Sequence, residues 1–482
     1  MPATNVAACM AARLNCKLQN LSSDHATYMP IQNIEVISDP FETHVMVVPK
    51  SDLWDWTLGA IIVTALLILL YFSASGGVFK PVLRHIESRH WLGMLVFPSI
   101  IWTVMGTLLL GFRTFLWFRY HPHPAADFIT APTLTVIIPA YNEGSMVEKS
   151  IDSVATAHYP RHQLEILVVD DGSKDDTWHY IEKAAKRHPH LVTAVRFVEN
   201  KGKRAALEMG FRRAKGEVVV TIDSDSVIEA GTLLAMAGPF RDPKIGAVAG
   251  RVAVYNRQQG LIPRMLAVRY TLSFDFLRAV QSTYKTVYCC PGALAAYRTS
   301  VVREVLDEWV GQTFLGAPCT YGEDRSMTNY ILSRGYDTVY QSAGVVNTIV
   351  PLTYGQLCKM FLRWDRSYVR EEIRFMRIVW KRPPIPRLIA IVDVVITNLR
   401  YPVGYTALGL LVFFTLEDPL TIVRVLFVIG LMATLNMFYY LRSERSWGAV
   451  YGVLYAYYSA FALFWIFPYA VLTVRARSWL TR

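Results

Sequence analysis

The chain has 482 residues, of which 53% are hydrophobic and 18% are charged. That balance is too apolar for an ordinary soluble protein and too charged for a bundle of membrane helices alone, so it indicates a soluble domain joined to membrane segments. The net charge of +11 suits contact with anionic headgroups and phosphorylated substrates, although the cytosolic loops of any membrane protein carry a similar excess.

The N-terminal region combines a polar tail with two apolar stretches. Residues 1–52 are polar and irregular, and we expect no signal peptide because no basic start precedes a short apolar run and a cleavage site. The stretches 56–78 and 91–112 are uncharged over 23 and 22 residues. About 20 apolar residues cross a bilayer as a helix, so we expect two transmembrane helices within residues 53–118.

The middle region, residues 119–352, is long enough for one domain and alternates β-branched runs with helix-like runs. The predicted strands are residues 134–139, 164–169, 192–198 and 218–222, with helices between them such as 175–187 and 201–213. This βαβ series predicts an α/β domain with a mostly parallel sheet and helices on both faces. Ligands of such sheets bind at the carboxyl ends of the strands, where the acidic motifs below are found.

The first acidic motif, Asp170-Asp171-Gly172, follows the second predicted strand. Carboxylates at this position are suited to accept hydrogen bonds from a uracil N–H or from ribose hydroxyls. The alternative is a polar turn in which Asp175 caps the next helix. We favour ligand contact for Asp170 and Asp171, and the capping role for Asp175.

The second acidic motif, Asp223-Ser-Asp225, comes directly after the strand 218–222. Side chains two apart on a strand face the same way, so we expect two carboxylates on one side. Such a pair suits magnesium or manganese, which would keep several waters and bridge diphosphate oxygens. An Asp-x-Asp pair alone is common, but this one follows the earlier motif at a second strand end.

The third acidic motif is Gly322-Glu-Asp-Arg325, at the start of a helix-like run. Asp324 is a candidate general base that removes the proton of an acceptor hydroxyl. The alternative is an ordinary helix N-terminus, where acidic side chains are favourable in any case. Only the presence of the other motifs makes the catalytic interpretation the preferred one.

A predicted amphipathic helix covers residues 356–380, within the segment 353–387. Its apolar side chains recur at three- and four-residue spacing, namely Leu357, Met360, Phe361, Trp364 and Tyr368. Its other faces are basic, with Lys359, Arg363, Arg366, Arg370, Arg374 and Arg377. We expect it to lie on the cytosolic membrane face. Trp364 could stack on an acceptor sugar and Arg363 could hold a diphosphate, or both could simply anchor the helix.

The C-terminal block, residues 388–482, is apolar again. Residues 401–416, 425–441 and 447–474 are uncharged, whereas 388–399 contains Asp393 and Pro468 interrupts the last stretch. Either of these two segments could be interfacial or re-entrant rather than spanning. Nine basic and three acidic side chains between residues 359 and 387 place that segment, and the catalytic domain before it, in the cytosol.

The chain has six cysteines, none in a paired Cys-x-x-Cys or Cys and His spacing. We therefore expect no structural zinc site and no disulfide framework, and we expect reduced thiols in a cytosolic domain.

Taken together, the motifs resemble those of the processive family 2 glycosyltransferases, most closely bacterial hyaluronan synthases and next rhizobial chitin-oligosaccharide synthases. The resemblance covers roughly residues 134–482 and the two N-terminal spans. It rests on an ordered set of motifs: Asp170-Asp171-Gly172, Asn200-Lys-Gly-Lys-Arg204, Asp223-Ser-Asp225, Gly322-Glu-Asp-Arg325, Arg363-Trp364 and Trp479-Leu-Thr-Arg482.

The resemblance implies a GT-A domain inserted between transmembrane helices, in a multi-pass protein of the inner or plasma membrane. It assigns Asp171 to the nucleotide, Asp223 and Asp225 to nucleotide and metal, and Asp324 to the base. The donor or diphosphate would contact Asp170, Lys203, Arg204, Arg325, Arg363 and Trp364, while Trp479 and Arg482 belong to an element that closes over the nucleotide. Two positions depart from the family pattern, Met360 and Leu480.

The expected function is polymerisation of UDP-sugars into a β-linked polysaccharide, of hyaluronan type if UDP-GlcNAc and UDP-GlcA are the donors, with export of the polymer. The expected partners are these donors, the growing acceptor and membrane lipids, with magnesium or manganese as cofactor, no nucleic acid, and a single chain sufficient. Alternatives are a chitin-oligosaccharide or other β-glycan synthase, a single-sugar lipid-phosphate glycosyltransferase, and a non-catalytic membrane scaffold.

An export channel would need rings that stack on sugar faces. The C-terminal block offers eight candidates, which could equally form the aromatic belts of a membrane interface: Tyr401, Tyr405, Tyr451, Tyr455, Tyr457, Tyr458, Trp465 and Tyr469.

Overall fold

The computed structural model describes residues 57, 60, 61, 64, 67, 68, 71 and 90–476. These belong to one compact unit, Met46–Arg482. The expectations for the polar tail, for most of the first transmembrane helix, and for Trp479 and Arg482 lie outside the described residues.

The core of the domain is an eight-stranded sheet with the order β3-β2-β1-β4-β7-β6-β10-β5. Its strands are β1 Leu134–Ala140, β2 Leu164–Asp170, β3 Val192–Arg196, β4 Val218–Ile222, β5 Ser226–Ile228, β6 Ile245–Val254, β7 Leu294–Arg298 and β10 Asp337–Thr348. The four predicted strands form one half of this sheet and pair in parallel. In the other half, β7 runs antiparallel to both β4 and β6, so the sheet is mixed.

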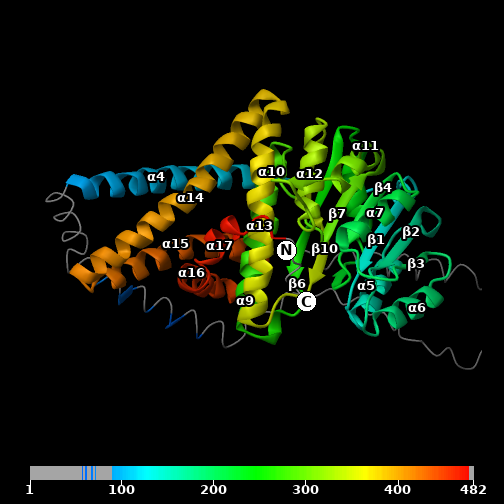
Figure 1. The fold of residues 1–482 in the computed structure, drawn as a ribbon, viewed down its shortest axis with the longest axis horizontal. Helices are drawn as coiled ribbons and strands as arrows, with labels where there is room; N and C mark the ends of the chain where they lie inside the picture. Colours follow the sequence, from blue (N-terminus) through cyan, green and yellow to red (C-terminus); the bar gives the residue numbers. More distant parts are fainter. Residues whose placement is uncertain are drawn as a thin grey trace, which may run out of the picture. The chain divides into compact units, whose positions relative to one another are not determined.

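Both faces of the sheet are covered, and the central strands β1 and β4 are mostly apolar. Every residue of β1 and of β4 is buried. Successive side chains of β1 enter different cores: Val136 and Ile138 pack into one cluster and Ile137 into another, as alternation along a strand requires. The predicted helices α6, Thr177–Arg187, and α7, Lys203–Arg213, flank this half together with α5, Met146–Ala155 (Figure 1).

Between β6 and β7 the chain forms a helical segment that the sequence did not reveal. It consists of α9, Leu261–Tyr270, a π-helical stretch, Thr271–Phe276, and α10, Leu277–Thr283. Its apolar side chains pack onto the C-terminal helices: Met265 and Val268 share a core cluster with Met437 and Val450. This segment therefore joins the sheet domain to the apolar block.

The predicted amphipathic helix is α13, Tyr354–Ile378, and it starts with a capping box formed by Thr353 and Gln356. It contacts α12, Glu323–Ser333, and α17, Ile466–Leu472 (Figure 1). The expectation of an exposed basic face is wrong for Arg366 and Arg370, which are buried. Arg366 donates to Thr473 Oγ1, 2.9 Å away, and Arg370 pairs with Glu371 at 3.0 Å.

Within the described part of the chain, three helices are long and apolar enough to span a membrane: α4, His90–Arg119, α14, Pro384–Glu417, and α15, Thr421–Glu444. The stretches 388–399 and 401–416 belong to one continuous helix, α14. Asp393 is tolerated inside it because its carboxylate pairs with Arg113 of α4 at 2.7 Å and accepts a bond from the Tyr288 hydroxyl at 3.0 Å.

The last apolar stretch is broken rather than straight. The segments Trp447–Ala462 and Ile466–Leu472 meet at an angle of 50°, and together they make either a broken span or a re-entrant loop. Pro468 lies in the first turn of α17, where its missing N–H costs nothing. The carbonyls left at the break are satisfied by tyrosine hydroxyls: Tyr405 donates to Phe464 O and Tyr354 to Ala462 O.

Candidate active site

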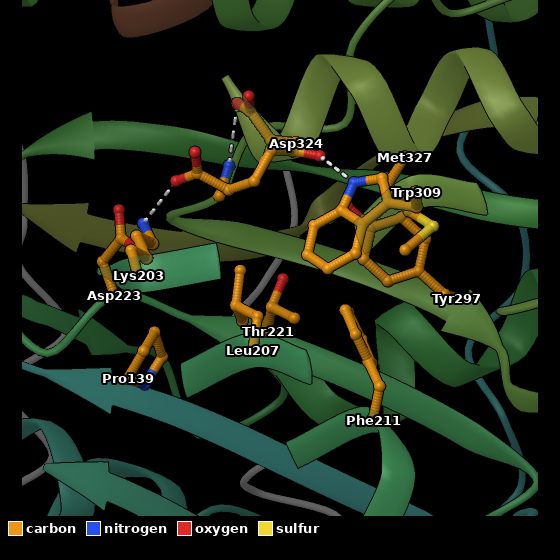
Figure 2. Close-up of a pocket in the computed structure, with 12 residues that line it drawn as sticks. Pro139, Lys203, Leu207, Phe211, Thr221, Asp223, Tyr297, Trp309, Asp324 and Met327 are labelled. Carbon is orange, nitrogen blue, oxygen red and sulfur yellow. Dashed lines mark hydrogen bonds and ion pairs between the residues drawn. The ribbon is translucent and has the colours of Figure 1, made fainter. Parts of the chain in front are cut away.

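A cavity of about 980 Å³ extends from the carboxyl end of β4 to the helices of the apolar block. Its lining includes Asp223, Asp225 and Asp324 in the sheet domain, Trp364 of α13, and residues of α14, α15 and α16, Val450–Ala462. Figure 2 shows a smaller adjoining pocket, which shares Lys203, Asp223 and Asp324 with this cavity. Three separate sequence motifs therefore converge on one space.

Asp170 and Asp171 lie at the end of β2, as predicted, but neither lines this cavity. Asp171 accepts hydrogen bonds from the amides of Lys201 and Gly202 at 2.7 and 2.9 Å and from the Asn200 side chain at 3.1 Å. Burial raises the pKa of Asp171, and the two amides oppose that rise. Asp170 is fully buried and pairs with Arg196 at 3.1 Å. Both carboxylates thus hold the loops beside the site.

Lys203 links two of the acidic motifs. Its ammonium forms an ion pair with Asp223 and lies 3.6 Å from Glu323 Oε1. Burial disfavours the charged ammonium, but the two carboxylates outweigh burial and raise the pKa of Lys203. Gly292 lies against this pair, because a Cβ there would come within 3.3 Å of Lys203 Nζ. A permanently charged lysine is therefore fixed at the wall of the cavity.

The expectation that Asp223 and Asp225 face the same way because they alternate on a strand is wrong. The strand β4 ends at Ile222, and the two residues lie in a turn closed by a bond from the Ser226 amide to Asp223 O at 3.1 Å. Both nevertheless line the same cavity. Asp225 accepts from the hydroxyls of Ser226 and Thr348 at 3.1 and 3.2 Å.

The two carboxylates fit a divalent cation that is shared with a diphosphate. No group of three or more His, Cys, Asp or Glu side chains within the described part of the chain could hold a metal alone. Magnesium needs only one or two carboxylates when phosphate oxygens and water complete its coordination. Gly292 lies beside this pair, because a Cβ there would be in van der Waals contact with Asp223 Oδ1, 3.7 Å away.

Asp324 is the second residue of α12, with its carboxylate turned to the cavity (Figure 2). Oδ2 accepts from the Gly292 amide at 3.2 Å and lies 3.5 Å from Cys289 Sγ, while Oδ1 accepts from the Arg325 amide at 2.7 Å. Burial and the nearby Asp324 carboxylate raise the pKa of the Cys289 thiol, so it stays protonated. The carboxylate is thus oriented by three donors at the edge of open space.

Arg325 also lines the cavity, where it pairs with Glu372 of α13 at 2.9 Å and lies over the Tyr368 ring at 4.8 Å. Burial opposes its charge, but Glu372 compensates and the pKa of Arg325 is raised. Arg325 therefore ties the helix of the candidate base to α13.

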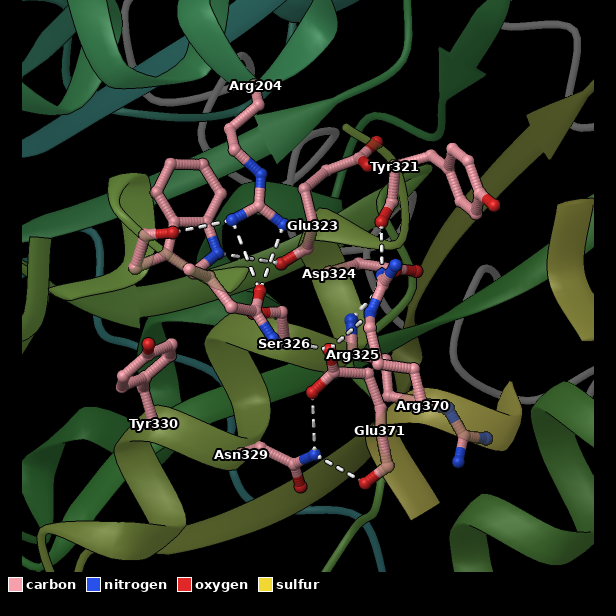
Figure 3. Close-up of polar contacts among 12 residues, drawn as sticks. Arg204, Tyr321, Glu323, Asp324, Arg325, Ser326, Asn329, Tyr330, Arg370 and Glu371 are labelled. Atoms are coloured by element: carbon pink, nitrogen blue, oxygen red, sulfur yellow. Dashed lines mark hydrogen bonds and ion pairs between the residues drawn. The ribbon is translucent and has the colours of Figure 1, made fainter. Parts of the chain in front are cut away.

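Arg204 is not placed at the cavity, contrary to the expectation that it lies near the donor. Its guanidinium is buried, stacks on the Trp309 ring at 4.7 Å, and bonds to Gln312 Oε1 at 3.2 Å. Figure 3 shows this polar cluster, in which Ser326, Asn329 and Glu371 continue the network. The arrangement gives Arg204 a structural role.

Arg363 and Trp364 of α13 both line the cavity. The Trp364 ring packs edge-on against Phe361 at 5.6 Å and Phe274 at 6.1 Å. Such packing fixes the ring while leaving part of it at the cavity surface. Met360, where the family pattern differs, is buried, and the Tyr270 hydroxyl lies 3.9 Å from its sulfur.

Of the eight candidate channel rings, three line the cavity, Tyr401, Tyr405 and Tyr455. The rest have other contacts, such as Tyr457, whose hydroxyl donates to Leu426 O at 2.7 Å. Among the described residues, Cys289, Cys290, Cys319 and Cys358 are free and buried.

Several charged groups of the cavity were missed by sequence reasoning. They come from α9, α10, α13 and α14, namely Arg269, Arg278, Asp365, Glu372 and Arg400. The only available signal was the presence of charges within otherwise apolar helical runs, as at Arg400.

Comparison with known proteins gives a consistent picture. Residues 135–306 match the family model described as glycosyl transferase family 2. The chain is 30% identical to the N-acetylglucosaminyltransferase of Azorhizobium caulinodans, over 73% of this chain and 87% of that protein. It is also 30% identical to a hyaluronan synthase of Streptococcus pyogenes, over 81% of this chain and 93% of that protein.

Among solved structures, the fold is similar to that of the mannosyltransferase PcManGT from Pyrobaculum calidifontis, solved in complex with GDP-Man and Mn2+. The TM-score is 0.54 and the identity is 23%, over 76% of this chain and 99% of that one.

Proposed function

The chain belongs to the family 2 glycosyltransferases and has a GT-A fold, and from this premise we propose that it is a processive polysaccharide synthase of the plasma membrane. It would take sugars from cytosolic UDP-sugars, join them into a β-linked polymer, and pass the polymer across the membrane through the same chain. UDP-GlcNAc is the first candidate donor, because it suits both kinds of relative, and UDP-GlcA is the second, giving a hyaluronan-type product.

The single observation that carries this proposal is the continuity of the cavity. The same space is lined by Asp223 and Asp324 at one end and by Leu411, Val425 and Ile429 of the membrane helices at the other. A hydrophilic polymer cannot cross a bilayer unaided, since each unpartnered hydroxyl costs roughly 1–3 kcal/mol. A route that starts at the transfer site and ends among membrane helices supports synthesis coupled to export.

The chemistry follows from the positions of the charged groups. A magnesium or manganese ion held by Asp223 and Asp225 would neutralise charge on the diphosphate leaving group. Lys203 and Arg363 line the same space and would bind phosphate oxygens. Asp324 would take the proton from the acceptor hydroxyl while that oxygen bonds to the anomeric carbon and the bond to UDP breaks.

One alternative is a synthase of chitin oligosaccharides from UDP-GlcNAc alone, which the relative from Azorhizobium supports. A second is transfer of one sugar to a lipid phosphate, which the apolar walls of the deep cavity would accommodate. Incubation of purified protein with a panel of UDP-sugars, followed by digestion and mass analysis of the product, separates these outcomes.

Export is tested with purified protein in sealed vesicles, with UDP-sugars added on the catalytic side. We expect polymer inside the vesicles, protected from a hydrolase added outside. If all polymer is digested, the chain makes the polymer but needs a separate exporter.

A further inference from the structure

Three charged side chains on different helices line the part of the cavity that the transfer chemistry does not use. They are Arg269 of α9, Asp365 of α13 and Arg400 of α14. The sequence separates Arg269 from Arg400 by more than a hundred residues, and only the packing of the helical segment after β6 against the C-terminal block brings them to one cavity.

The two arginines differ from the other arginines of this cavity in their partners. Arg113 and Arg325 are each matched by a carboxylate, at 2.7 and 2.9 Å. Within residues 90–476, by contrast, no carboxylate lies within ion-pair distance of Arg269 or Arg400. Both side chains stay accessible, since Arg400 is exposed and Arg269 is partly exposed, so their N–H donors can be reached by an anionic guest in the cavity.

Arg400 is held ready for such a guest. Its guanidinium lies 4.5 Å from the centre of the Tyr401 ring and donates to the Tyr401 hydroxyl at 2.5 Å. Tyr401 is itself stacked on Phe467, with ring centres 3.4 Å apart and planes 7° from parallel. Because a guanidinium has five N–H donors, the bond to Tyr401 leaves donors available for a planar anion such as a carboxylate.

Asp365 completes the group. Its carboxylate has no hydrogen-bond partner among the described residues, although it lines the cavity. Burial raises the pKa of Asp365 to about 6, against the opposing effect of Arg400 and Arg269. Near neutral pH two guanidinium charges therefore face one carboxylate, and one positive charge remains uncompensated.

We propose that Arg269 and Arg400, with Asp365, form a product subsite for a sugar that carries a carboxylate. The two arginines would form charge-assisted hydrogen bonds with the sugar carboxylate. Asp365 would accept a hydrogen bond from a sugar hydroxyl. The rings of Trp364 and Tyr405 line the same cavity and would contact sugar faces. This inference rests on the proposed polymerase function and selects an acidic polymer over a neutral one.

The test compares two probes on full-length protein in detergent: a tetrasaccharide of alternating GlcNAc and GlcA, and chitotetraose. Calorimetry should show tighter binding of the acidic probe by the wild type. Arg269→Gln and Arg400→Gln should each weaken that binding by about tenfold or more, as expected for loss of a charge-assisted pair, while changing chitotetraose binding less than about twofold. Arg377→Gln is the matched control, since Arg377 is an exposed arginine of α13 outside the cavity lining.

A wild type without preference for the acidic probe, or variants that lose both probes equally, would overturn the subsite. So would variants that lose undecaprenyl phosphate instead of the acidic probe, because the anion would then be a lipid phosphate. Arg400→Lys keeps the positive charge and controls for a folding defect in Arg400→Gln. It should retain part of the preference for the acidic probe over chitotetraose. Polymer synthesis by the same preparation is measured in parallel, so that failure of the polymerase function is distinguished from failure of the subsite alone.

Discussion

Asp223 has two neighbours that constrain what a substitution can do. Its carboxylate balances the half-buried Lys203 ammonium, and it lines the cavity next to Gly292. Asp223→Asn should reduce synthesis by roughly two orders of magnitude or more, because a cation bridging to the diphosphate supplies several kcal/mol of charge stabilisation. The measurement is UDP release, with chelator-washed wild type and added magnesium or manganese in parallel. Full activity of the washed enzyme would refute a metal role for this residue.

Asp324 is oriented by donors from Gly292 and Arg325, and neither contact involves the nucleotide. We therefore expect Asp324→Asn to leave UDP affinity nearly unchanged while lowering the transfer rate on the order of 10²–10⁴-fold, the range of general-base catalysis. Calorimetric UDP binding and polymer formation give the two readouts. A variant that keeps more than about a tenth of the rate would make Asp324 a helix-end residue only.

Asp365 offers a prediction for stability against pH. Its pKa is about 6 in the folded chain, mainly because of burial, against an ordinary value of 3.8. Because the pKa is higher in the folded chain, the ionised carboxylate lowers the free energy of unfolding above about pH 6. This loss of stability fades as the pH falls toward 3.8, where the carboxyl becomes protonated in the folded and the unfolded chain alike. Asp365→Asn should therefore raise the thermal midpoint in mildly alkaline buffer, and raise it less in acidic buffer.

The matched control is Asp307→Asn, because the Asp307 side chain is 86% exposed and should change the midpoint little at either pH. If Asp365→Asn raises the thermal midpoint by the same amount at both pH values, ionisation of this buried carboxylate is not the cause of the stabilisation.

At the scale of elements, the junction of α12 with α13 depends on one glycine. Gly322 has a positive φ of 74°, and a Cβ there would lie 1.9 Å from Ser367 Oγ. Gly335 has a similar φ of 87°, but a Cβ there would meet nothing within 4 Å. Gly335→Ala should cost about 1–2 kcal/mol of backbone strain, and Gly322→Ala should cost more because Ser367 or the helix must move. Thermal unfolding of the two variants isolates the contact, and equal losses would contradict it.

The sequence predicted one half of the sheet well and the other half not at all, for physical reasons. Strands such as β1 are continuous apolar runs, buried on both faces, and such runs are recognisable. By contrast, β10 contains a register shift between Gln341 and Val345. Gln341 is buried because its amide donates to His123 O and Ala235 O, contacts that no local pattern reveals.

The same distinction applies to the site. Motif residues at strand ends, such as Asp223, were predictable because strand ends converge on one edge of the sheet. The position of Arg204 was not, because its basic side chain is drawn into the core by Trp309 and Gln312. Arg269 and Arg400 share a cavity only through long-range helix packing, and hydrophobic periodicity does not encode such packing.

At the scale of the whole molecule, coupling of synthesis to export predicts that the deep cavity can be blocked without harming the chemistry. Gly404 of α14 lines the cavity, and a Cβ there would meet nothing within 4 Å. Gly404→Trp should shorten the polymer and reduce its export, while UDP release in the first transfers continues. Gly409→Trp is the matched control, since Gly409 is on the same helix with equal space but outside the cavity lining. Unchanged polymer length in Gly404→Trp would contradict the proposed route.

The hydrophobic core that surrounds the sheet is shared with helices far along the chain. Leu294 of β7, Leu357 of α13 and Ile466 of α17 belong to one cluster of buried side chains. Consequently the catalytic half is not an exchangeable module. A chimera that joined it to the membrane helices of a distant relative would bring together two surfaces shaped by different partners, and at native packing density such mismatches leave cavities or clashes. Substitutions in the sheet domain and in the C-terminal helices are therefore expected to have evolved together, because a change of side chain on one side of α13 requires a compensating change on the other.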